Sequence, residues 1–186
     1  MTTPFAQLLS PPRAGFVFLE NPMSKPPYVR NDQGLYRVKG YVSPDQLVQI
    51  AADILLENLA GQENLTQPKD AARFLQLSLA QEKNEHFSVL FLNNKHQVLC
   101  FERLFSGTID GAAVYPRVVA QKALEHNAAA VIFAHNHPSD NCEPSESDRS
   151  ITLRLKDALS LIDVRVLDHF VVSRSTWVSL AERGWI

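Results

Sequence analysis

Residues 135–148 read HNHPSDNCEPSESD, and this stretch decides how the rest of the chain is interpreted. It places His135 and His137 two residues apart, followed by a proline, and then Ser145 and Asp148 in the spacing Ser-x-x-Asp. Two imidazoles and one carboxylate are the three protein ligands that a catalytic zinc ion uses when its fourth position is left to water. The stretch therefore predicts a metal site with His135, His137 and Asp148 as ligands.

The flanking residues place these ligands on a strand–loop–helix unit. Residues 129–134 (AAVIFA) form an unbroken apolar run, which is typical of a buried strand. Both histidines then fall at its carboxyl end, where open α/β sheets bind their ligands. Because a residue before proline is biased to extended backbone, His135 and His137 are expected to project to the same side. A helix is predicted over 146–162, with Asp148 on the face toward the sheet, where a carboxylate needs a partner.

Each half of the pattern also has an ordinary structural interpretation. Ser145-x-x-Asp148 is a common helix-capping signature, since the serine accepts backbone amides and the helix dipole favours the acid. A His-x-His pair alone is more often a surface or hydrogen-bonded pair than a metal site. Their combination on one structural unit favours the metal site, and Ser145 can cap the helix as well.

The complete pattern, His-x-His-Pro followed after six residues by Ser-x-x-Asp, resembles the JAMM signature of the JAB/MPN metalloprotease family. The HNHPS segment is similar in particular to the RadC-like branch of that family. Asp140 and Val118 depart from that branch, which usually has glycine and glutamate at these positions. The resemblance covers roughly residues 66–186 and includes Glu85-His86-Phe87, Phe105-Ser106-Gly107-Thr108, Pro116-Arg117 and Leu167-Asp168-His169.

The resemblance implies a fold, a cofactor and an activity. The fold would be α/β (α+β), with helices flanking a curved, mostly antiparallel sheet, in the JAB/MPN cytidine-deaminase-like arrangement. The cofactor would be one Zn²⁺ per chain, held by His135, His137, Asp148 and a water whose pKa falls toward about 7. The activity would be cleavage of a peptide or isopeptide bond in a peptide or protein substrate.

The resemblance also assigns roles to two further residues. A general base must take the proton of the water and pass it to the leaving amine, and in this family it is a glutamate from an upstream strand. Glu85, just before the apolar run 87–92, is the better match, and Glu102 on the next strand is the rival. Either could instead be a solvated glutamate at a strand end. Ser145 would donate a hydrogen bond to the developing oxyanion.

Asp168 interrupts an apolar row on one face of a strand predicted over 164–173, a row made of Val164, Val166, Phe170 and Val172. It could accept from a ligand histidine and orient it, as metal-bound imidazoles usually require. It could equally accept backbone amides in a loop or bulge. His169 is expected on the opposite face, as a satisfied or exposed histidine, and His86, His96 and His126 are expected on the surface.

The composition restricts the classes of protein to consider. With 186 residues, 45% hydrophobic and 20% charged, the chain suits one well-buried domain and a modest extension. Its 18 basic against 20 acidic residues give no surplus for nucleic-acid binding, although Arg149 and Arg154 leave a local patch open. No long apolar run favours export or membrane insertion. Two cysteines without a CxxC spacing favour a reducing cytoplasm, and Cys142 is expected not to be a ligand.

The chain is expected to divide near residue 66. Residues 1–65 would form an N-terminal extension with a proline-rich arm, a short strand over 36–42 and one helix from a Ser43 cap to Gly61. Residues 66–186 would form the catalytic domain, which opens with a helix over 68–80 and continues with strands 87–92, 98–104, 129–134, 164–173 and 177–180 and helices 114–126 and 146–162. The helix-hairpin-helix segment usual in RadC-like proteins is not recognised in residues 1–65.

Three functions are compared on this basis. The leading one is a zinc-dependent hydrolase that cleaves an amide by a metal-activated water. The alternative is a RadC-type accessory or DNA-processing protein associated with DNA repair, which the charge balance disfavours. A third is a partner-binding module with a degraded metal site, which the intact set of ligands disfavours. The physiological substrate and the oligomeric state are left open.

Overall fold

The computed structural model describes residues 26–61, 65, 67–107 and 113–186. Within these ranges the helices and strands follow one another as β1 (Tyr28–Arg30), β2 (Tyr36–Val38), α1 (Pro44–Gly61), α2 (Pro68–Leu79), β3 (His86–Leu92), β4 (Val98–Ser106), α3 (Pro116–Glu125), β5 (Ala130–Asn136), α4 (Glu146–Ser160), β6 (Arg165–Val172) and β7 (Trp177–Ser179).

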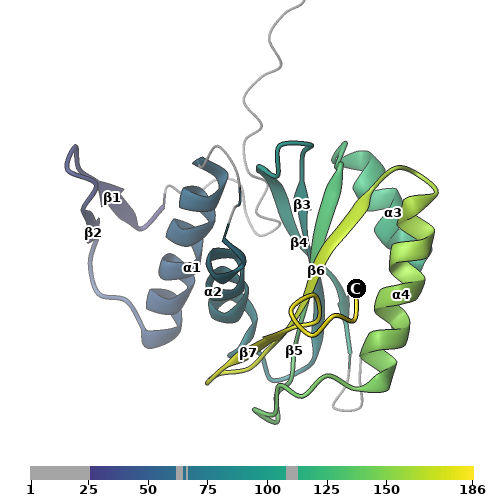
Figure 1. The fold of residues 1–186 in the computed structure, drawn as a ribbon. Coiled ribbons are helices and arrows are strands. Elements are labelled where there is room, and N and C mark those ends of the chain that lie inside the picture. The colour runs from purple at the N-terminus through teal and green to yellow at the C-terminus, as the bar shows by residue number, and fades with distance from the viewer. Residues whose placement is uncertain (1–25, 62–64, 66, 108–112) are drawn as a thin grey trace, which may run out of the picture.

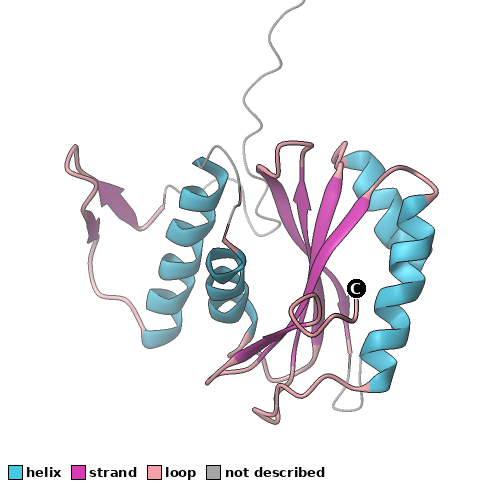
Figure 2. Ribbon diagram, viewed as in Figure 1, coloured by secondary structure: helices cyan, strands magenta, loops and turns pink. Residues whose placement is uncertain are grey.

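The central sheet has five strands in the order β4-β3-β5-β6-β7. Neighbouring strands are antiparallel except β5 and β6, which are parallel and joined through α4. Figures 1 and 2 show α1 and α2 on one side of this sheet and α3 and α4 on the other. The predicted mixed α/β fold, with helices flanking a mostly antiparallel sheet, is therefore confirmed.

Helices on both faces explain why the two central strands are apolar almost without interruption. Alternate side chains of a strand point to opposite faces, so a strand covered on both sides buries all of them. Leu90 and Ile132 face the core on the side of α1 and α2. Phe91 and Phe133 face the core on the side of α3 and α4. His135 has the same parity as Phe133, so it lies on the α4 side.

The strand β6 does not have the single apolar row that the sequence predicted. Its pairing with β5 shifts by one residue, because Val131 faces Val166 while Ile132 faces Asp168. The extra residue, Leu167, is a bulge that reverses which side the following residues face. Val166 therefore packs toward α4 and Phe170 toward α2, and the prediction that they share a face was wrong.

The extension differs from its prediction in one strand. The expected strand over 36–42 is present as the shorter β2, and it pairs with β1, which was not expected. Helix α1 runs to Gly61 as predicted, and its Leu56 and Leu59 pack into the same core as α2. Residues 1–25, which include most of the predicted proline-rich arm, and Thr108 lie outside the described residues. Within the described ranges, no helix combines the length and hydrophobicity needed to cross a membrane.

Candidate metal centre

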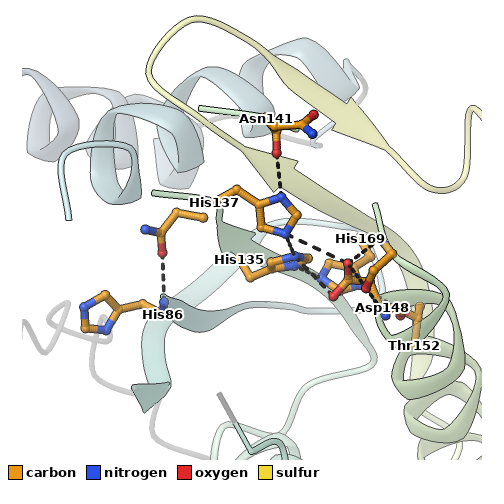
Figure 3. A network of polar contacts seen from close by, with 9 residues as sticks. His86, His135, His137, Asn141, Asp148, Thr152 and His169 are labelled. Carbon is orange, nitrogen blue, oxygen red and sulfur yellow. Dashed lines mark hydrogen bonds and ion pairs between the residues drawn. The ribbon is translucent and has the colours of Figure 1, made fainter. Parts of the chain in front are cut away.

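Three side chains from β5, the following loop and α4 meet at one point. His135 Nε2 lies 3.0 Å from His137 Nε2 and 3.4 Å from Asp148 Oδ1. His137 Nε2 lies 3.9 Å from Asp148 Oδ2, and one ligand atom from each residue lies within 4.8 Å of the others. Figure 3 shows the three groups turned toward a common centre. The structure thus brings together the three residues that the sequence predicted as metal ligands.

Asp148 is held by the first turn of its own helix. Its Oδ2 accepts from the backbone N–H of Ser145 and from Ser145 Oγ, both at 2.7 Å, while its backbone N–H donates to Ser145 Oγ at 3.1 Å. This is the reciprocal capping box that the spacing indicated, and it is compatible with a ligand role because Oδ1 is left to face His135. Ser145 therefore caps α4 and orients the carboxylate at the same time.

The loop that carries His137 is anchored to β6 and to the turn after it. The backbone N–H of His137 donates to the Val172 carbonyl at 2.9 Å. Buried Cys142 points its Sγ at the Thr176 carbonyl, 3.1 Å away, and so turns from the metal centre as expected for a non-ligand. Asp140 has a left-handed backbone with φ of 63°, which explains why glycine suits this position. The Asp140 side chain accepts two hydrogen bonds from Ser175.

His169 lies on the opposite face of β6 from Asp168 and is a satisfied histidine, as predicted, but its contact with the predicted ligand His135 was not expected. Its Nε2 lies 2.8 Å from His135 Nδ1, and its Nδ1 lies 2.6 Å from Thr152 Oγ1. The ring is fully buried and makes T-shaped contacts with Phe87 and Phe133. The sequence carried no signal for this contact, since the bulge at Leu167 decides which face His169 occupies.

Hydrogen bonding leaves a lone pair on each histidine at the centre. His137 Nδ1 lies 2.6 Å from the Asn141 carbonyl, which can only accept, so in the neutral ring Nδ1 carries the proton and Nε2 carries the lone pair. His135 reaches the same state through the contact of its Nδ1 with His169 Nε2. Two unprotonated Nε2 atoms 3.0 Å apart repel each other unless a proton or a cation lies between them. With a carboxylate oxygen beside them, this donor set fits a zinc ion.

Glu85 shares a pocket with the three ligands. The pocket has a volume of about 550 Å³, and Ser145 and the apolar residues Phe87, Val114 and Ile151 also line it. Asn136, between the two histidines, fixes the backbone around Glu85, because its side chain accepts from the His86 N–H at 2.8 Å and donates to the Asn84 carbonyl at 2.9 Å. Figure 3 shows the contact to His86. No spacing or periodicity in the sequence indicated this role of Asn136.

Glu102 belongs to a different cluster. Its Oε1 lies 2.5 Å from His126 Nε2 and its Oε2 lies 3.6 Å from Lys122 Nζ, between β4 and the end of α3. Cys100 Sγ lies 4.0 Å from the same Oε1, so these side chains also have the spacing of metal ligands. A lysine already neutralises this carboxylate, and burial raises the pKa of the Cys100 thiol to about 11, so the group is a poor competitor for zinc. His126 packs against Phe91 with the two rings tilted and, like His86 and His96, is partly exposed at the surface.

Asp168 lies on the opposite side of the sheet from His169. Its buried carboxylate accepts from the backbone N–H groups of His169 and Ala181 and from Ser179 Oγ, at 2.7, 3.1 and 2.6 Å. These contacts match the second of the two roles considered for it, in which the acid satisfies backbone amides at a bulge. The residue that contacts a ligand histidine is His169.

A larger hollow of about 780 Å³ lies elsewhere, between α1, the end of α2 and β4. Polar side chains such as Gln49, Gln76 and Arg103 line it. Among the described residues it contains neither of the two groups with the spacing of metal ligands. The pocket with Glu85 and the three predicted ligands is therefore the candidate active site.

The buried histidines predict a pH-dependent stability of the metal-free protein. Burial lowers the pKa of His135 from 6.5 to about 4 against the opposing attraction of Asp148, and burial lowers the pKa of His169 well below 6.5. The unfolded chain therefore binds more protons than the folded chain below about pH 6.5, and the free energy of unfolding falls as the pH decreases. Urea unfolding of chelator-treated protein should show a lower midpoint at pH 5 than at pH 7.

Replacing a buried histidine separates its contribution to the pH dependence of stability from the contribution of the acidic side chains, which also titrate at low pH. His135→Asn removes one titrating group and is expected to reduce the loss of stability between pH 7 and pH 5. His96→Asn, at a partly exposed histidine of the β3–β4 turn, is the matched control and should retain the wild-type dependence. Equal dependence in wild type and His135→Asn would show that His135 does not stay neutral in the folded protein.

Comparison with known proteins places the same region in a sequence family. A family described as the RadC-like JAB domain matches residues 65–185. A UPF0758 protein of Vibrio cholerae is 52% identical over 141 residues, which cover 76% of this chain and 89% of the relative. A UPF0758 protein of Xanthomonas oryzae pv. oryzae is 51% identical over 139 residues, which cover 75% of this chain and 62% of that relative.

Proposed function

The chain belongs to the RadC-like JAB domain family, and from this premise we propose that it is a zinc-dependent hydrolase that cleaves a peptide or isopeptide bond. One observation supports the proposal above the others. Two imidazole Nε2 atoms and a carboxylate converge on the wall of a pocket that also contains Glu85 and Ser145. A Lewis-acid site, a base and a hydrogen-bond donor in one pocket are the parts that amide hydrolysis requires.

His135, His137 and Asp148 would hold the zinc, which lowers the pKa of a coordinated water toward about 7. Glu85 would accept the proton of the attacking water and deliver it to the nitrogen of the leaving amine. Asn136 holds the backbone on both sides of Glu85 in place. Rotation of the Glu85 side chain would then carry its carboxylate from the attacking water to the nitrogen of the leaving amine.

Ser145 would donate its hydroxyl proton to the oxyanion that forms on the substrate carbonyl. In the structure the same proton is donated to Asp148 Oδ2. Asp148 would remain held when the hydroxyl turns away, because the backbone N–H of Ser145 donates to the same oxygen at 2.7 Å. The serine hydroxyl could therefore donate to the substrate while the backbone N–H of Ser145 still holds the Asp148 carboxylate.

We do not extend the proposal to nucleic acid. Arg149, which follows the ligand Asp148, and Arg183 both stack on the ring of Trp185. Each of these arginines also has an acidic partner, Glu146 for Arg149 and Glu143 for Arg183. With a net charge of −2 for the chain, this cluster gives no unopposed positive surface for a phosphate backbone.

The proposed activity is tested with a library of peptides and lysine-linked isopeptides incubated with zinc-loaded protein. Cleavage of at least one class is expected, with loss of cleavage when a chelator is added and recovery when zinc is restored. The Glu85→Gln variant, loaded with zinc in the same way, is the control for a contaminating protease. Equal cleavage by wild type and Glu85→Gln would remove the assignment of the activity to this pocket.

A further inference from the structure

A buried chain of hydrogen bonds connects two of the zinc ligands behind the metal centre. It runs from His135 on β5 through His169 on β6 and Thr152 on α4 to the backbone carbonyl of Asp148, at 2.8, 2.6 and 2.5 Å. Figure 3 shows these groups in sequence beside the centre. We propose that His169 and Thr152 are positioning residues, which set the tautomer of His135 and hold the sheet and helix ligands in register for zinc.

The Asp148 carbonyl, at one end of this chain of hydrogen bonds, determines which group donates and which accepts in each of them. The Asp148 carbonyl can only accept, so the Thr152 hydroxyl donates to it, as a helical threonine commonly does to the residue four before it. Thr152 Oγ1 has then used its one proton and must accept from His169 Nδ1. A neutral His169 has no proton left on Nε2, which therefore accepts from His135 Nδ1.

The last bond leaves His135 Nε2 without a proton. That atom is the one that faces His137 Nε2 and Asp148 Oδ1 at the centre. The hydroxyl of Thr152 therefore determines, through two imidazoles, that the lone pair of His135 points at the metal position. A histidine that exchanged its two tautomers would present the lone pair there only part of the time.

Burial keeps solvent from replacing the hydrogen bonds between His135, His169 and Thr152. His135, Thr152 and His169 are each at most 1% exposed, and the His169 ring makes T-shaped contacts with Phe87 and Phe133. Because these side chains have almost no contact with solvent, loss of the Thr152 hydroxyl would leave His169 Nδ1 without its partner. His169 could then turn its proton toward His135 and reverse the tautomer of the ligand.

Thr152 offers a matched pair of substitutions that separates hydrogen bonding from packing. Thr152→Val keeps the branched shape and removes the hydroxyl, whereas Thr152→Ser keeps the hydroxyl and removes a methyl group. Zinc titration of metal-free protein is expected to show a 10- to 100-fold weaker affinity in Thr152→Val, roughly the effect of losing such a partner, and nearly wild-type affinity in Thr152→Ser. A purely structural role predicts the reverse order, because Thr152→Ser creates the cavity.

The inference rests on the proposed zinc site but not on hydrolysis, and a second measurement separates the two. Long-range ¹H–¹⁵N correlation of the histidine rings in metal-free protein should show His135 protonated at Nδ1 in wild type and Thr152→Ser, and a mixed or reversed tautomer in Thr152→Val. Unchanged zinc affinity in Thr152→Val, or an unchanged His135 tautomer, would overturn the positioning role. If wild type bound no zinc, the proposed function would fail, and the tautomer measurement alone would decide what the hydrogen-bond chain does.

Discussion

Purified His135→Ala and Asp148→Asn proteins are expected to lose their zinc, falling from about one ion per chain in wild type toward none. His135→Ala removes one of the three protein ligands and Asp148→Asn replaces the charged carboxylate with a neutral, weaker amide oxygen, and the two unchanged ligands cannot compensate. His137 is limited by its bond to the Asn141 carbonyl, and the second oxygen of Asp148 is already committed to Ser145. Metal analysis after dialysis, with zinc titration of the apoproteins, measures the effect.

The choice of Asn at position 148 keeps the folding of α4 separate from metal binding. An Asn side chain retains an oxygen that can accept from the backbone N–H of Ser145, so the helix cap survives while the negative charge is lost. Asp148→Ala would also remove the half of the capping box in which the carboxylate accepts from the backbone N–H of Ser145, while Ser145 Oγ could still accept from the backbone N–H of residue 148. Loss of zinc in a variant with the wild-type unfolding midpoint therefore reports on ligation alone.

A histidine from the second cluster provides the matched control for His135→Ala. His126→Ala removes a partner of Glu102 at the end of α3 and is expected to retain the full zinc content. Zinc retained by His135→Ala but lost from His126→Ala would move the metal to the cluster of Cys100, Glu102 and His126. Zinc retained by both variants would refute the ligand assignment for both groups.

The sequence predicted the parts of the site that depend on local spacing. His135 and His137 are separated by one residue on an extended backbone, and Ser145 and Asp148 by one helical turn, so their relative positions follow from secondary structure alone. The strand and helix that carry them were also recognisable, because an apolar run and a helical stripe flank the motif. The meeting of His135 with Asp148 required one further step, the packing of α4 on the α3 side of the sheet.

The contacts that the sequence did not reveal depend on pairing between distant strands. His169 reaches His135 because β6 lies beside β5 and because a bulge at Leu167 reverses the faces of β6. A one-residue bulge leaves the composition of a strand unchanged. In a strand of eight residues such as β6, its effect on the alternation of apolar and polar residues is too small to recognise. Asn136 likewise accepts from the backbone N–H of His86 at the start of β3, fifty residues earlier in the chain. An asparagine at this position does not by itself indicate that partner.

Glu85→Gln is expected to retain one zinc per chain and to lose turnover by about 10²- to 10⁴-fold, the usual contribution of a general base. The substitution keeps the size of the side chain and removes its ability to accept and carry a proton. Glu85 lines the pocket of the three ligands without being one of them, so the metal should be unaffected. The measurement is cleavage of the best peptide or isopeptide substrate, with metal analysis of the same sample.

Glu102→Gln is the matched control, because it makes the same chemical change in the rival glutamate. Glu102 is paired with His126 and Lys122 and is absent from the residues that line the pocket, so its variant should turn over at nearly the wild-type rate. The opposite result would be an active Glu85→Gln and an inactive Glu102→Gln. It would require the substrate to bind beside Glu102, His126 and Lys122, near the end of α3. Since the three ligands converge on the Glu85 side, that outcome would contradict the orientation of the metal centre as well as the identity of the base.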